Sequence, residues 1–328
     1  MYNKTILVTG GTGSWGYELI KQLLKESPKE IRIFSRNETV QFEMQQQFNN
    51  HDNFKFIIGD IRDKEALVSA CKGVHYVFHL AALKHVPVCE YQPYEAIKTN
   101  INGTENVIEA SIQNNVEKVI YVSTDKAADP SNTYGMTKAI GEKLIIHANL
   151  QSSKTKFICV RGGNVLGSNG SVVPIFKNQI KEYSKIGITD FDMTRFFLTI
   201  EEAVELLFKA TKEGKGGEIF VMKMPACKIT DLAEVLIEDS QNTDVQIKEL
   251  GIRPGEKLSE ILLSEVESKT SICFGEDYFV VLPTIHIEGL QEHYSNYPPV
   301  TLSNYSSQQE FLQKSEVKKM LKKGGFIS

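Results

Sequence analysis

The sequence predicts an α/β fold, with a doubly wound parallel sheet and a smaller C-terminal substrate lobe. Three features of the first half of the chain predict it. Short runs of continuous apolar residues recur, amphipathic stretches separate them, and a glycine-rich turn follows the first run. Continuous apolar runs are typical of strands covered on both faces, which is how helices cover a parallel sheet.

The predicted elements follow one another at short intervals. We expect strands at residues 5–10, 31–35, 54–59, 75–81, 118–123 and 157–160. A first helix is expected at 17–26, where apolar residues recur at 19, 20, 23 and 24. From about residue 163 the pattern becomes irregular. Helices near 201–213 and 230–238, a short strand at 218–221 and a loop at 253–257 suggest a smaller lobe.

The composition narrows the classes of partner. The formal net charge of −4 provides no basic surface for nucleic acid. The five cysteines are widely spaced without a CxxC pair, so we expect reduced thiols and neither a disulfide framework nor a metal site. No apolar segment approaches the roughly 20 residues that span a bilayer, and the N-terminus lacks an apolar signal segment. We expect a soluble cytoplasmic protein without a membrane partner.

The glycine-rich turn after the first strand is the first candidate binding site. In TILVTGGTGSWG, Gly10, Gly13 and Gly16 are spaced GxxGxxG, with Ser14 and Trp15 among them. Glycine allows a tight turn and a close approach of the backbone to a pyrophosphate, and the following helix N-terminus favours negative charge. This pattern predicts a Rossmann-type NAD(P)-binding domain at 1–163. It leaves 164–328 mostly to a substrate-binding lobe, with allowance for the chain crossing back.

The end of the second strand indicates which nicotinamide cofactor binds. An acidic residue there would bind the ribose 2′-hydroxyl of NAD, but this strand ends in Ser35 and Arg36, and an arginine suits the 2′-phosphate of NADP. We therefore expect NADP, with NAD as the alternative; a surface arginine without a ligand is the competing interpretation. Further cofactor contacts are expected at Asp60, Ile61, Ala81 and Ala82.

The stretch STDKAADPSNTYGMTK presents the candidate catalytic residues. Tyr134 and Lys138 are four residues apart and share one face of a helix. A lysine ammonium beside a phenol favours the phenolate, so Tyr134 can act as a general base, and Lys138 can also hold the nicotinamide ribose. Thr124, at the end of the preceding strand, can hydrogen-bond the substrate hydroxyl that is oxidised.

After the GxxGxxG loop, this stretch resembles the extended short-chain dehydrogenase/reductases. Asp125 and Lys126 narrow the resemblance. A 4-epimerase only moves hydride at one carbon, whereas a 4,6-dehydratase also removes the C5 proton and expels the C6 hydroxyl. Asp-Lys within STDKAA is similar to the inverting UDP-N-acetylglucosamine 4,6-dehydratases of bacterial flagellin and capsule sugar pathways, such as pseudaminic acid synthesis. Sugar-retaining dehydratases usually carry Asp-Glu. A surface ion pair that caps the turn is the competing interpretation.

The resemblance extends over about residues 4 to 263, through blocks such as GNVLGSNGSVVPIF, ITDFDMTRFFLTIEEAV and GIRPGEKLSE. It implies that Lys84 contacts both cofactor and substrate. Arg253 suits a diphosphate clamp, since a guanidinium fork matches phosphate, and Glu256 suits a ribose hydroxyl. An ion pair between these two residues is the competing interpretation. The resemblance also implies substrate contacts at Asn164, Val172, Thr194 and Arg195.

One position departs from the family pattern. Relatives usually carry Arg, an aromatic residue and then Gly-Asn, whereas this chain has Arg161, Gly162, Gly163 and Asn164. The loss of a ring beside the sugar site is expected to open space or add flexibility there. Such a change would admit an altered substrate, including an intermediate of the same pathway.

The resemblance implies a UDP-sugar 4,6-dehydratase that inverts C5 and is a lyase by outcome. In the expected cycle, Tyr134 takes the 4-hydroxyl proton while hydride passes to the nicotinamide. Lys126 takes the C5 proton, Asp125 protonates the leaving C6 hydroxyl, and hydride returns to C6. The alternatives are an enzyme acting on a dehydrated UDP-4-keto or 5,6-ene sugar, a UDP-sugar 4-epimerase, and a cofactor-sensing protein without catalysis, against which the tyrosine–lysine pair argues. A homo-oligomer, dimer or hexamer, is expected.

Overall fold

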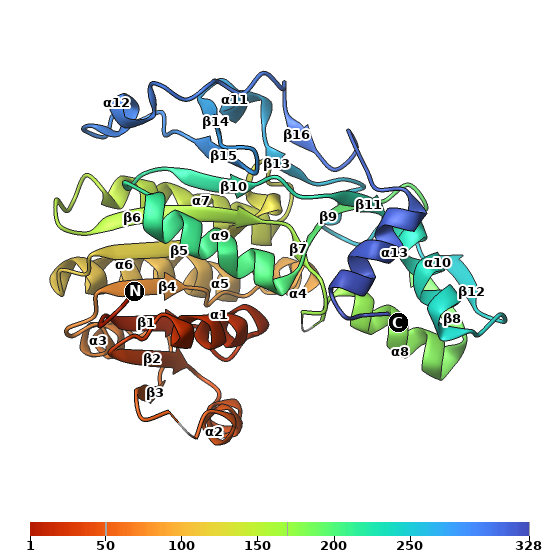
Figure 1. Cartoon of the computed structure of the whole chain (residues 1–328), viewed down its shortest axis with the longest axis horizontal. Coiled ribbons are helices and arrows are strands. Elements are labelled where there is room, and N and C mark those ends of the chain that lie inside the picture. The colour runs from red at the N-terminus through yellow and green to blue at the C-terminus, as the bar shows by residue number, and fades with distance from the viewer. Residues whose placement is uncertain (50, 169, 328) are drawn as a thin grey trace.

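A computed structural model describes residues 1–49, 51–168 and 170–327 as two lobes of an α/β structure (Figure 1). The larger lobe is built on a sheet with the strand order β14-β15-β10-β6-β5-β4-β1-β2-β3. The strands from β3 to β10 pair in parallel, and β15 and β14 add an antiparallel edge. The order β3-β2-β1-β4-β5-β6 is that of doubly wound dinucleotide-binding sheets. The predicted fold class is confirmed.

The expected strands of the first half are present, and their ends agree with the prediction to within two residues. The short strand expected at 218–221 is also present, but it belongs to the main sheet, where it pairs with β6. The strands of the main sheet are β1 (Thr5–Thr9), β2 (Glu30–Ser35), β3 (Phe54–Ile58), β4 (Tyr76–His79), β5 (Lys118–Thr124), β6 (Lys156–Gly162), β10 (Ile219–Met222), β14 (Ser271–Phe274) and β15 (Tyr278–Val281).

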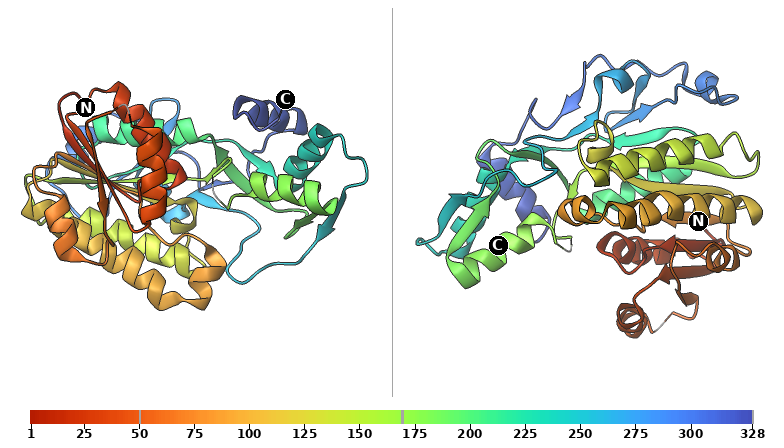
Figure 2. Two further views of the ribbon diagram at one scale, coloured as in Figure 1. Left: turned by 90° about the horizontal axis from the view of Figure 1, so that it is seen from below. Right: turned by 180° about the vertical axis from the view of Figure 1, so that it is seen from behind.

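Helices cover both faces of this sheet (Figure 2). One face carries α1 (Ser14–Lys25) and α9 (Ile200–Glu213), and the other carries α3 (Lys64–Ala70), α6 (Gly103–Gln113) and α7 (Thr133–Ala148). The sheet and these helices enclose the main hydrophobic core. Shorter elements connect them: α2 (Glu38–Gln47), α4 (Val86–Tyr91), α5 (Pro93–Ile97), the π-helical segment η1 (Lys98–Asn102) and the 3₁₀ turn η2 (Asp125–Ala127).

The smaller lobe has a hydrophobic core of its own, formed by residues from 166 onward. Its helices α8 (Val172–Tyr183) and α10 (Ile229–Ser240) pack beside the strand pair of β8 (Lys185–Ile188) and β12 (Gln246–Glu249) (Figure 1). A third helix, α13 (Lys314–Lys323), packs against α10. A three-stranded sheet of β7 (Asn164–Val165), β9 (Thr194–Leu198) and β11 (Ala226–Lys228) connects the lobes. The remaining elements are β13 (Ile261–Leu263), α11 (Glu265–Ser268), α12 (Leu290–Tyr294) and β16 (Tyr305–Ser306).

The chain crosses between the lobes more than once. After residue 163 it enters the smaller lobe, returns to the sheet at β10, and returns again at β14 and β15. The domain boundary at residue 163 stays a prediction. The carboxyl ends of the parallel strands face the smaller lobe (Figure 1), so any ligand at these ends meets residues of both. Among the described residues, no helix combines the length and apolarity needed to cross a membrane.

Candidate active site

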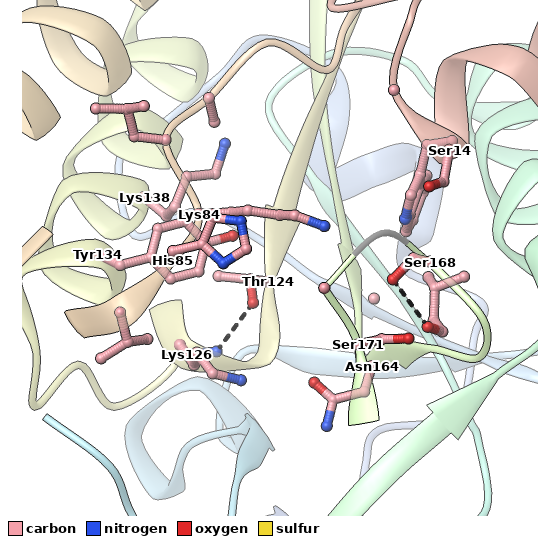
Figure 3. A pocket seen from close by; sticks show the side chains of 18 of the residues that line it. Ser14, Lys84, His85, Thr124, Lys126, Tyr134, Lys138, Asn164, Ser168 and Ser171 are labelled. Carbon is pink, nitrogen blue, oxygen red and sulfur yellow. Dashed lines mark hydrogen bonds between the residues drawn. The ribbon is translucent and has the colours of Figure 1, made fainter. Parts of the chain in front are cut away.

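A cleft of about 820 Å³ lies between the carboxyl ends of the parallel strands and the smaller lobe. The glycine loop and the residues that follow β2 to β6 form one side, and α8, β8 and the loop at 250–256 form the other. Ligands of open α/β sheets bind at this edge. Figure 3 shows Tyr134, Lys138 and Lys84 on one side of the cleft, across from Asn164 and Ser171.

The glycine loop is shaped by close backbone contacts. Gly10 has a φ of +69°, and a Cβ atom there would lie 2.7 Å from the backbone nitrogen of Ala81. Gly13 is the N-cap of α1, whose first turn carries no acidic residue. A helix N-terminus of this kind favours an anion, so the loop fits the pyrophosphate of a dinucleotide. The loop residues that line the cleft include Gly10, Gly13, Ser14, Trp15 and Gly16.

The indole ring of Trp15 packs against Gly162. A Cβ atom at Gly162 would lie 3.2 Å from Cη2 and 3.3 Å from Cζ2 of Trp15. A ring from the glycine loop therefore fills the side to which a Cβ atom would point, while Gly162 also lines the cleft. A large side chain at one position and none at the other make the two residues complementary in volume.

The cleft is lined by the four residues expected to contact the adenosine part of the cofactor, Ser35, Arg36, Asp60 and Ile61. Nη1 of Arg36 lies 3.9 Å from Oδ2 of Asp60, and 58% of the Arg36 side chain is exposed. Burial raises the pKa of Asp60, but hydrogen bonds from Arg62 and the charge of Arg36 outweigh burial and lower it. The site thus offers an ionised carboxylate as an acceptor and a guanidinium that can meet a phosphate. These residues fit either NAD or NADP.

Tyr134 and Lys138 both lie on α7 and line the cleft. The helix is fixed at its start by Asn132, whose side chain accepts a hydrogen bond from the N–H of Gly135 at 2.7 Å. Burial raises the pKa of Tyr134 to about 12, against the opposing effects of the Lys126 charge and a hydrogen bond with Thr124. At neutral pH Tyr134 is therefore a phenol, and it needs further stabilisation of the phenolate to act as a base.

The side chain of Lys138 is turned toward Tyr121 on β5. Its Nζ lies 3.8 Å from the centroid of the Tyr121 ring, and the residue is 3% exposed. Burial lowers the pKa of Lys138 to about 7, while Glu142 raises it. In the structure, the charge that lowers the pKa of Tyr134 is that of Lys126. The expected effect of Lys138 on the Tyr134 phenol stays a prediction.

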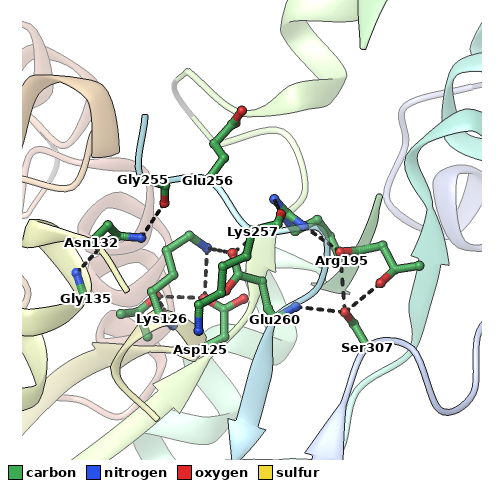
Figure 4. Close-up of polar contacts among 12 residues, drawn as sticks. Asp125, Lys126, Asn132, Gly135, Arg195, Gly255, Glu256, Lys257, Glu260 and Ser307 are labelled. Carbon is green, nitrogen blue, oxygen red and sulfur yellow. Dashed lines mark hydrogen bonds and ion pairs between the residues drawn. The ribbon is translucent and has the colours of Figure 1, made fainter. Parts of the chain in front are cut away.

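A cluster of four charged side chains lies beside Thr124 (Figure 4). Nζ of Lys126 lies 3.0 Å from Oδ1 of Asp125 and 3.0 Å from Oε1 of Glu260, and Nε of Arg195 lies 3.7 Å from the same Glu260 oxygen. The hydroxyl of Thr124 donates to Oδ1 of Asp125 at 2.9 Å. Burial lowers the pKa of Lys126, but the carboxylates of Asp125 and Glu260 outweigh burial and raise it well above its usual value.

The members of this cluster differ in their access to the cleft. Lys126 and Glu260 line it, whereas Asp125 does not and has a side chain that is 1% exposed. Oδ2 of Asp125 is buried and has no hydrogen-bond partner among the described residues. Lys126 is therefore the group of the Asp125–Lys126 pair that a sugar in the cleft would meet first.

The residues expected to contact substrate are mostly in the cleft. Thr194 is not, because its buried hydroxyl lies 2.8 Å from Oγ of Ser307. The competing ion pair between Arg253 and Glu256 is present, and Glu256 also accepts a hydrogen bond from Thr189 at 3.0 Å. The Arg253 side chain is nevertheless 62% exposed, so the ion pair and a phosphate contact are compatible. The expected substrate residues that line the cleft are Lys84, Asn164, Val172, Arg195, Arg253 and Glu256.

Several cleft residues were not foreseen. His85, Ser168 and Glu260 line the cleft although the sequence did not single them out. Ala81 and Ala82 also line it, and both were expected to do so. Of the residues that were not foreseen, Glu260 has the most direct contact with a candidate catalytic residue. Glu260 is the last residue of the GIRPGEKLSE block, and its place in that motif is the sequence feature that could have marked it as a site residue. The neighbouring residues give no indication of a contact with Lys126. The described residues contain no group of three or more His, Cys, Asp or Glu that could hold a metal ion.

The arrangement combines a glycine loop that fits a dinucleotide with acid–base groups in the same cleft. Thr124, Tyr134 and Lys138 are suited to oxidation of a hydroxyl group, and Lys126 adds a second proton-transfer group beside them. Such a site can carry out chemistry at two neighbouring carbons of one substrate.

The comparisons with known proteins agree with this chemistry. An uncharacterized membrane protein of Methanocaldococcus jannaschii is 47% identical over 99% of this chain and 97% of its own. An inverting UDP-N-acetylglucosamine 4,6-dehydratase of Campylobacter jejuni serotype O:23/36 is 46% identical over 90% of this chain and 88% of its own. A UDP-glucose 4-epimerase of Rickettsia rickettsii is 45% identical over 90% and 86%.

Solved structures are similar in fold to most or all of this chain. Pen from Bacillus thuringiensis is 41% identical, with a TM-score of 0.93 over 99% of both chains. DesIV, a dTDP-glucose 4,6-dehydratase from Streptomyces venezuelae, is 20% identical with a TM-score of 0.71 over 77% of this chain and 86% of its own, and it shows likeness of fold alone. The polysaccharide biosynthesis protein family matches residues 6–282. The chain therefore belongs to this family of extended short-chain dehydrogenase/reductases.

Proposed function

We propose that the protein is an inverting 4,6-dehydratase of UDP-N-acetylglucosamine or a close UDP-linked derivative. The observation that carries the proposal is the pair Asp125–Lys126 beside Thr124 and Tyr134, at the nicotinamide end of a dinucleotide cleft. The similar dehydratase of Campylobacter jejuni supports the same reaction. A step in the synthesis of a modified surface sugar, such as pseudaminic acid, is the proposed setting.

The first half of the proposed reaction is oxidation at C4. A bound nicotinamide would supply the hydride acceptor and later the hydride donor. Thr124 orients the 4-hydroxyl group, and Tyr134 accepts its proton. Lys138 would hold the ribose of a bound cofactor, and its ammonium would add positive charge near the Tyr134 phenol. The ketone that forms at C4 acidifies the C5–H bond.

The second half of the proposed reaction is loss of water and inversion at C5. Lys126 faces the cleft and, once it has passed its resting proton to Asp125, removes the C5 proton. Asp125 supplies the proton to the leaving C6 oxygen, and because its carboxyl group is covered in the structure, this step requires the carboxyl group to turn toward the cleft. Hydride would return to C6 from a bound nicotinamide, and a solvent-derived proton added to C5 from the opposite face would invert that centre. The reaction has no net redox change, so the enzyme is a lyase.

A UDP-sugar 4-epimerase is the second candidate, because the similar protein of Rickettsia rickettsii carries that name. An epimerase would return hydride to C4 and would leave C5 and C6 unchanged. The Asp125–Lys126 pair would then have no proton to move.

Incubation of the purified protein with UDP-N-acetylglucosamine separates the two candidates. The dehydratase is expected to give a product lighter by one water, with deuterium at C5 when the reaction is run in D₂O. The epimerase would give a product of unchanged mass with a new configuration at C4. No reaction with this substrate, but turnover of a 4-keto or 5,6-ene UDP-sugar, would place the enzyme later in the same sequence.

We further propose that the cofactor is NADP rather than NAD. Arg36 supports this proposal, since its exposed guanidinium lies at the end of β2, where a 2′-phosphate would bind. Denaturing the purified protein and identifying the released nucleotide tests it. Release of NAD alone would contradict the proposal and would leave Arg36 only its contact with Asp60.

We also propose a homo-oligomer that buries one exposed face of the larger lobe. Three helices that pack together, α4, α5 and α7, carry exposed apolar side chains. Apolar patches of this kind often mark protein interfaces. Sedimentation analysis of Tyr91→Glu against wild type tests the face. The residues that form it are Val88, Tyr91, Tyr94, Ile97, Met136 and Ile140.

The described cysteines are all free thiols, which fits the proposed cytoplasmic location.

A further inference from the structure

Glu260 contacts Lys126, the proposed C5 base, and also lines the cleft. It lies just before β13, far from Lys126 in the sequence, and its side chain is 3% exposed. Its backbone is fixed by Ser307, whose Oγ accepts a hydrogen bond from the Glu260 N–H at 3.0 Å and whose N–H donates to the Glu260 carbonyl at 3.0 Å. A carboxylate with a fixed backbone and little exposure can hold a neighbouring ammonium in one place.

Lys126 is the nearer of the two cations beside the Glu260 carboxylate. Oε1 of Glu260 lies 3.0 Å from Nζ of Lys126 but 3.7 Å from Nε of Arg195. Arg195 instead donates to the carbonyl oxygens of Thr194 at 2.7 Å and Lys257 at 2.7 Å. The guanidinium of Arg195 is therefore anchored by the main chain, and Lys126 depends on the two carboxylates.

We propose that Glu260 is a positioning residue for the C5 step, acting through Lys126. This inference rests on the proposed function. When Lys126 passes its resting proton to Asp125 across their 3.0 Å contact, Asp125 becomes the carboxylic acid and Lys126 the free amine. The amine then takes the C5 proton, the C5–H electron pair moves into the enolate, and the amine becomes an ammonium again. Glu260, still ionised, orients the amine and stabilises that ammonium.

Glu260 can stabilise the protonated Lys126 because of where the charges lie during the C5 step. With Asp125 protonated, Glu260 is the remaining carboxylate within 3.0 Å of Nζ among the described residues. An opposite charge at this distance raises the basicity of an amine. The other groups that face Lys126 are the phenol of Tyr134 on α7 and the guanidinium of Arg195 on β9, and neither supplies negative charge at neutral pH.

The test compares Glu260→Gln, Glu260→Asp and the control Glu265→Gln, which removes an exposed carboxylate from the neighbouring helix α11. Reduction of the bound cofactor by UDP-N-acetylglucosamine reports the C4 step, and deuterium uptake at C5 in D₂O reports the C5 step. Glu260→Gln is expected to keep the C4 step within about threefold of wild type and to slow C5 exchange by about 10- to 100-fold, below the full loss of a general base. Glu260→Asp should recover part of the exchange.

A second measurement does not need the substrate. The titration of the Lys126 side chain can be followed by ¹³Cε–¹⁵Nζ NMR, with its signal assigned by its absence in Lys126→Ala. Glu260→Gln should lower the pKa of Lys126 by about 1 to 3 pH units, and Glu265→Gln should leave it unchanged. An unchanged pKa in Glu260→Gln overturns the inference, as does unchanged C5 exchange or an equal loss of both half-reactions. If wild type itself shows no C5 exchange, the proposed function fails, while the titration still decides whether Glu260 acts on Lys126.

Discussion

At the scale of single residues, Lys138 shows a conflict between function and stability. Burial lowers its folded pKa to about 7 from the usual lysine value of about 10.4. Between these values the unfolded chain binds the proton more strongly, so the contribution of Lys138 to the free energy of unfolding rises with pH across this window. We predict that Lys138→Met abolishes turnover but raises Tm near pH 7, by removing the cost of burying the amine.

The pH dependence distinguishes this explanation from a general packing effect. The gain in Tm of Lys138→Met over wild type should be largest at or below pH about 7 and should shrink toward pH about 10. Calorimetry at several pH values measures it. A gain that stays constant with pH would mean that the ammonium is not the source of the cost.

Tyr134 carries the second prediction at this scale. Tyr134→Phe should remove C4 oxidation, with a loss of about 10² to 10⁴ in rate, because it removes the proposed general base. UDP binding, measured by calorimetry, should stay close to wild type. Near-wild-type turnover would show that another group takes the hydroxyl proton.

The site residues that could be predicted are those within short sequence motifs. Thr124, Tyr134 and Lys138 lie within one stretch of fifteen residues, and helical periodicity alone places the last two on one face. Glu260 could not be placed this way, because its contact with Lys126 depends on how the smaller lobe returns to the sheet. The turn of Lys138 toward Tyr121 likewise depends on packing between α7 and β5.

At the scale of elements, Trp15 at the start of α1 and Gly162 at the end of β6 determine how closely these elements approach. A Cβ atom at Gly162 would lie 3.2 Å from the indole, so a small addition is tolerated only if the ring moves by a few tenths of an ångström. We predict that Gly162→Tyr lowers cofactor content and Tm, because its ring needs the space that Trp15 fills. Trp15→Ala combined with Gly162→Tyr should recover part of both.

A double-mutant cycle measures this coupling, since contacting residues are non-additive. Cofactor content after purification and Tm are recorded for wild type, both single variants and the double variant. Gly73→Tyr is a suitable control, because no atom lies within 4 Å of a Cβ built there, although its φ of +69° adds strain without a clash. Additive losses in the cycle would show that Trp15 and Gly162 act independently.

The strands illustrate what an apolar pattern can and cannot predict. Continuous Val, Ile and Phe runs located the first six strands well, because both faces of a central parallel strand are buried. The same kind of run at 218–221 was assigned to the smaller lobe, whereas the strand it forms, β10, belongs to the main sheet. A strand's partner depends on long-range packing, and the sequence of β10 carries no mark of its pairing with β6 and β15.

At the scale of the whole molecule, Arg161 joins segments that are distant in the sequence. From β6 its guanidinium donates to Glu142 on α7 at 2.8 and 2.6 Å, and to Glu267 on α11 at 2.9 and 2.7 Å. Its Nη1 also donates to the carbonyl of Leu262 at 3.1 Å. The helix that carries Tyr134 is thus tied to both the sheet and the C-terminal segment.

We predict that Arg161→Met destabilises the protein by about 3–5 kcal/mol, because it leaves two carboxylates without their buried counter-charge. The matched control is Arg253→Met, which also breaks an arginine–glutamate pair but at a guanidinium that is 62% exposed, so its expected cost is about 0–1 kcal/mol. Urea unfolding of both variants measures the difference. Equal costs would mean that the Arg161 cluster adds no more stability than a surface ion pair, and that α7 is held in place by apolar packing alone.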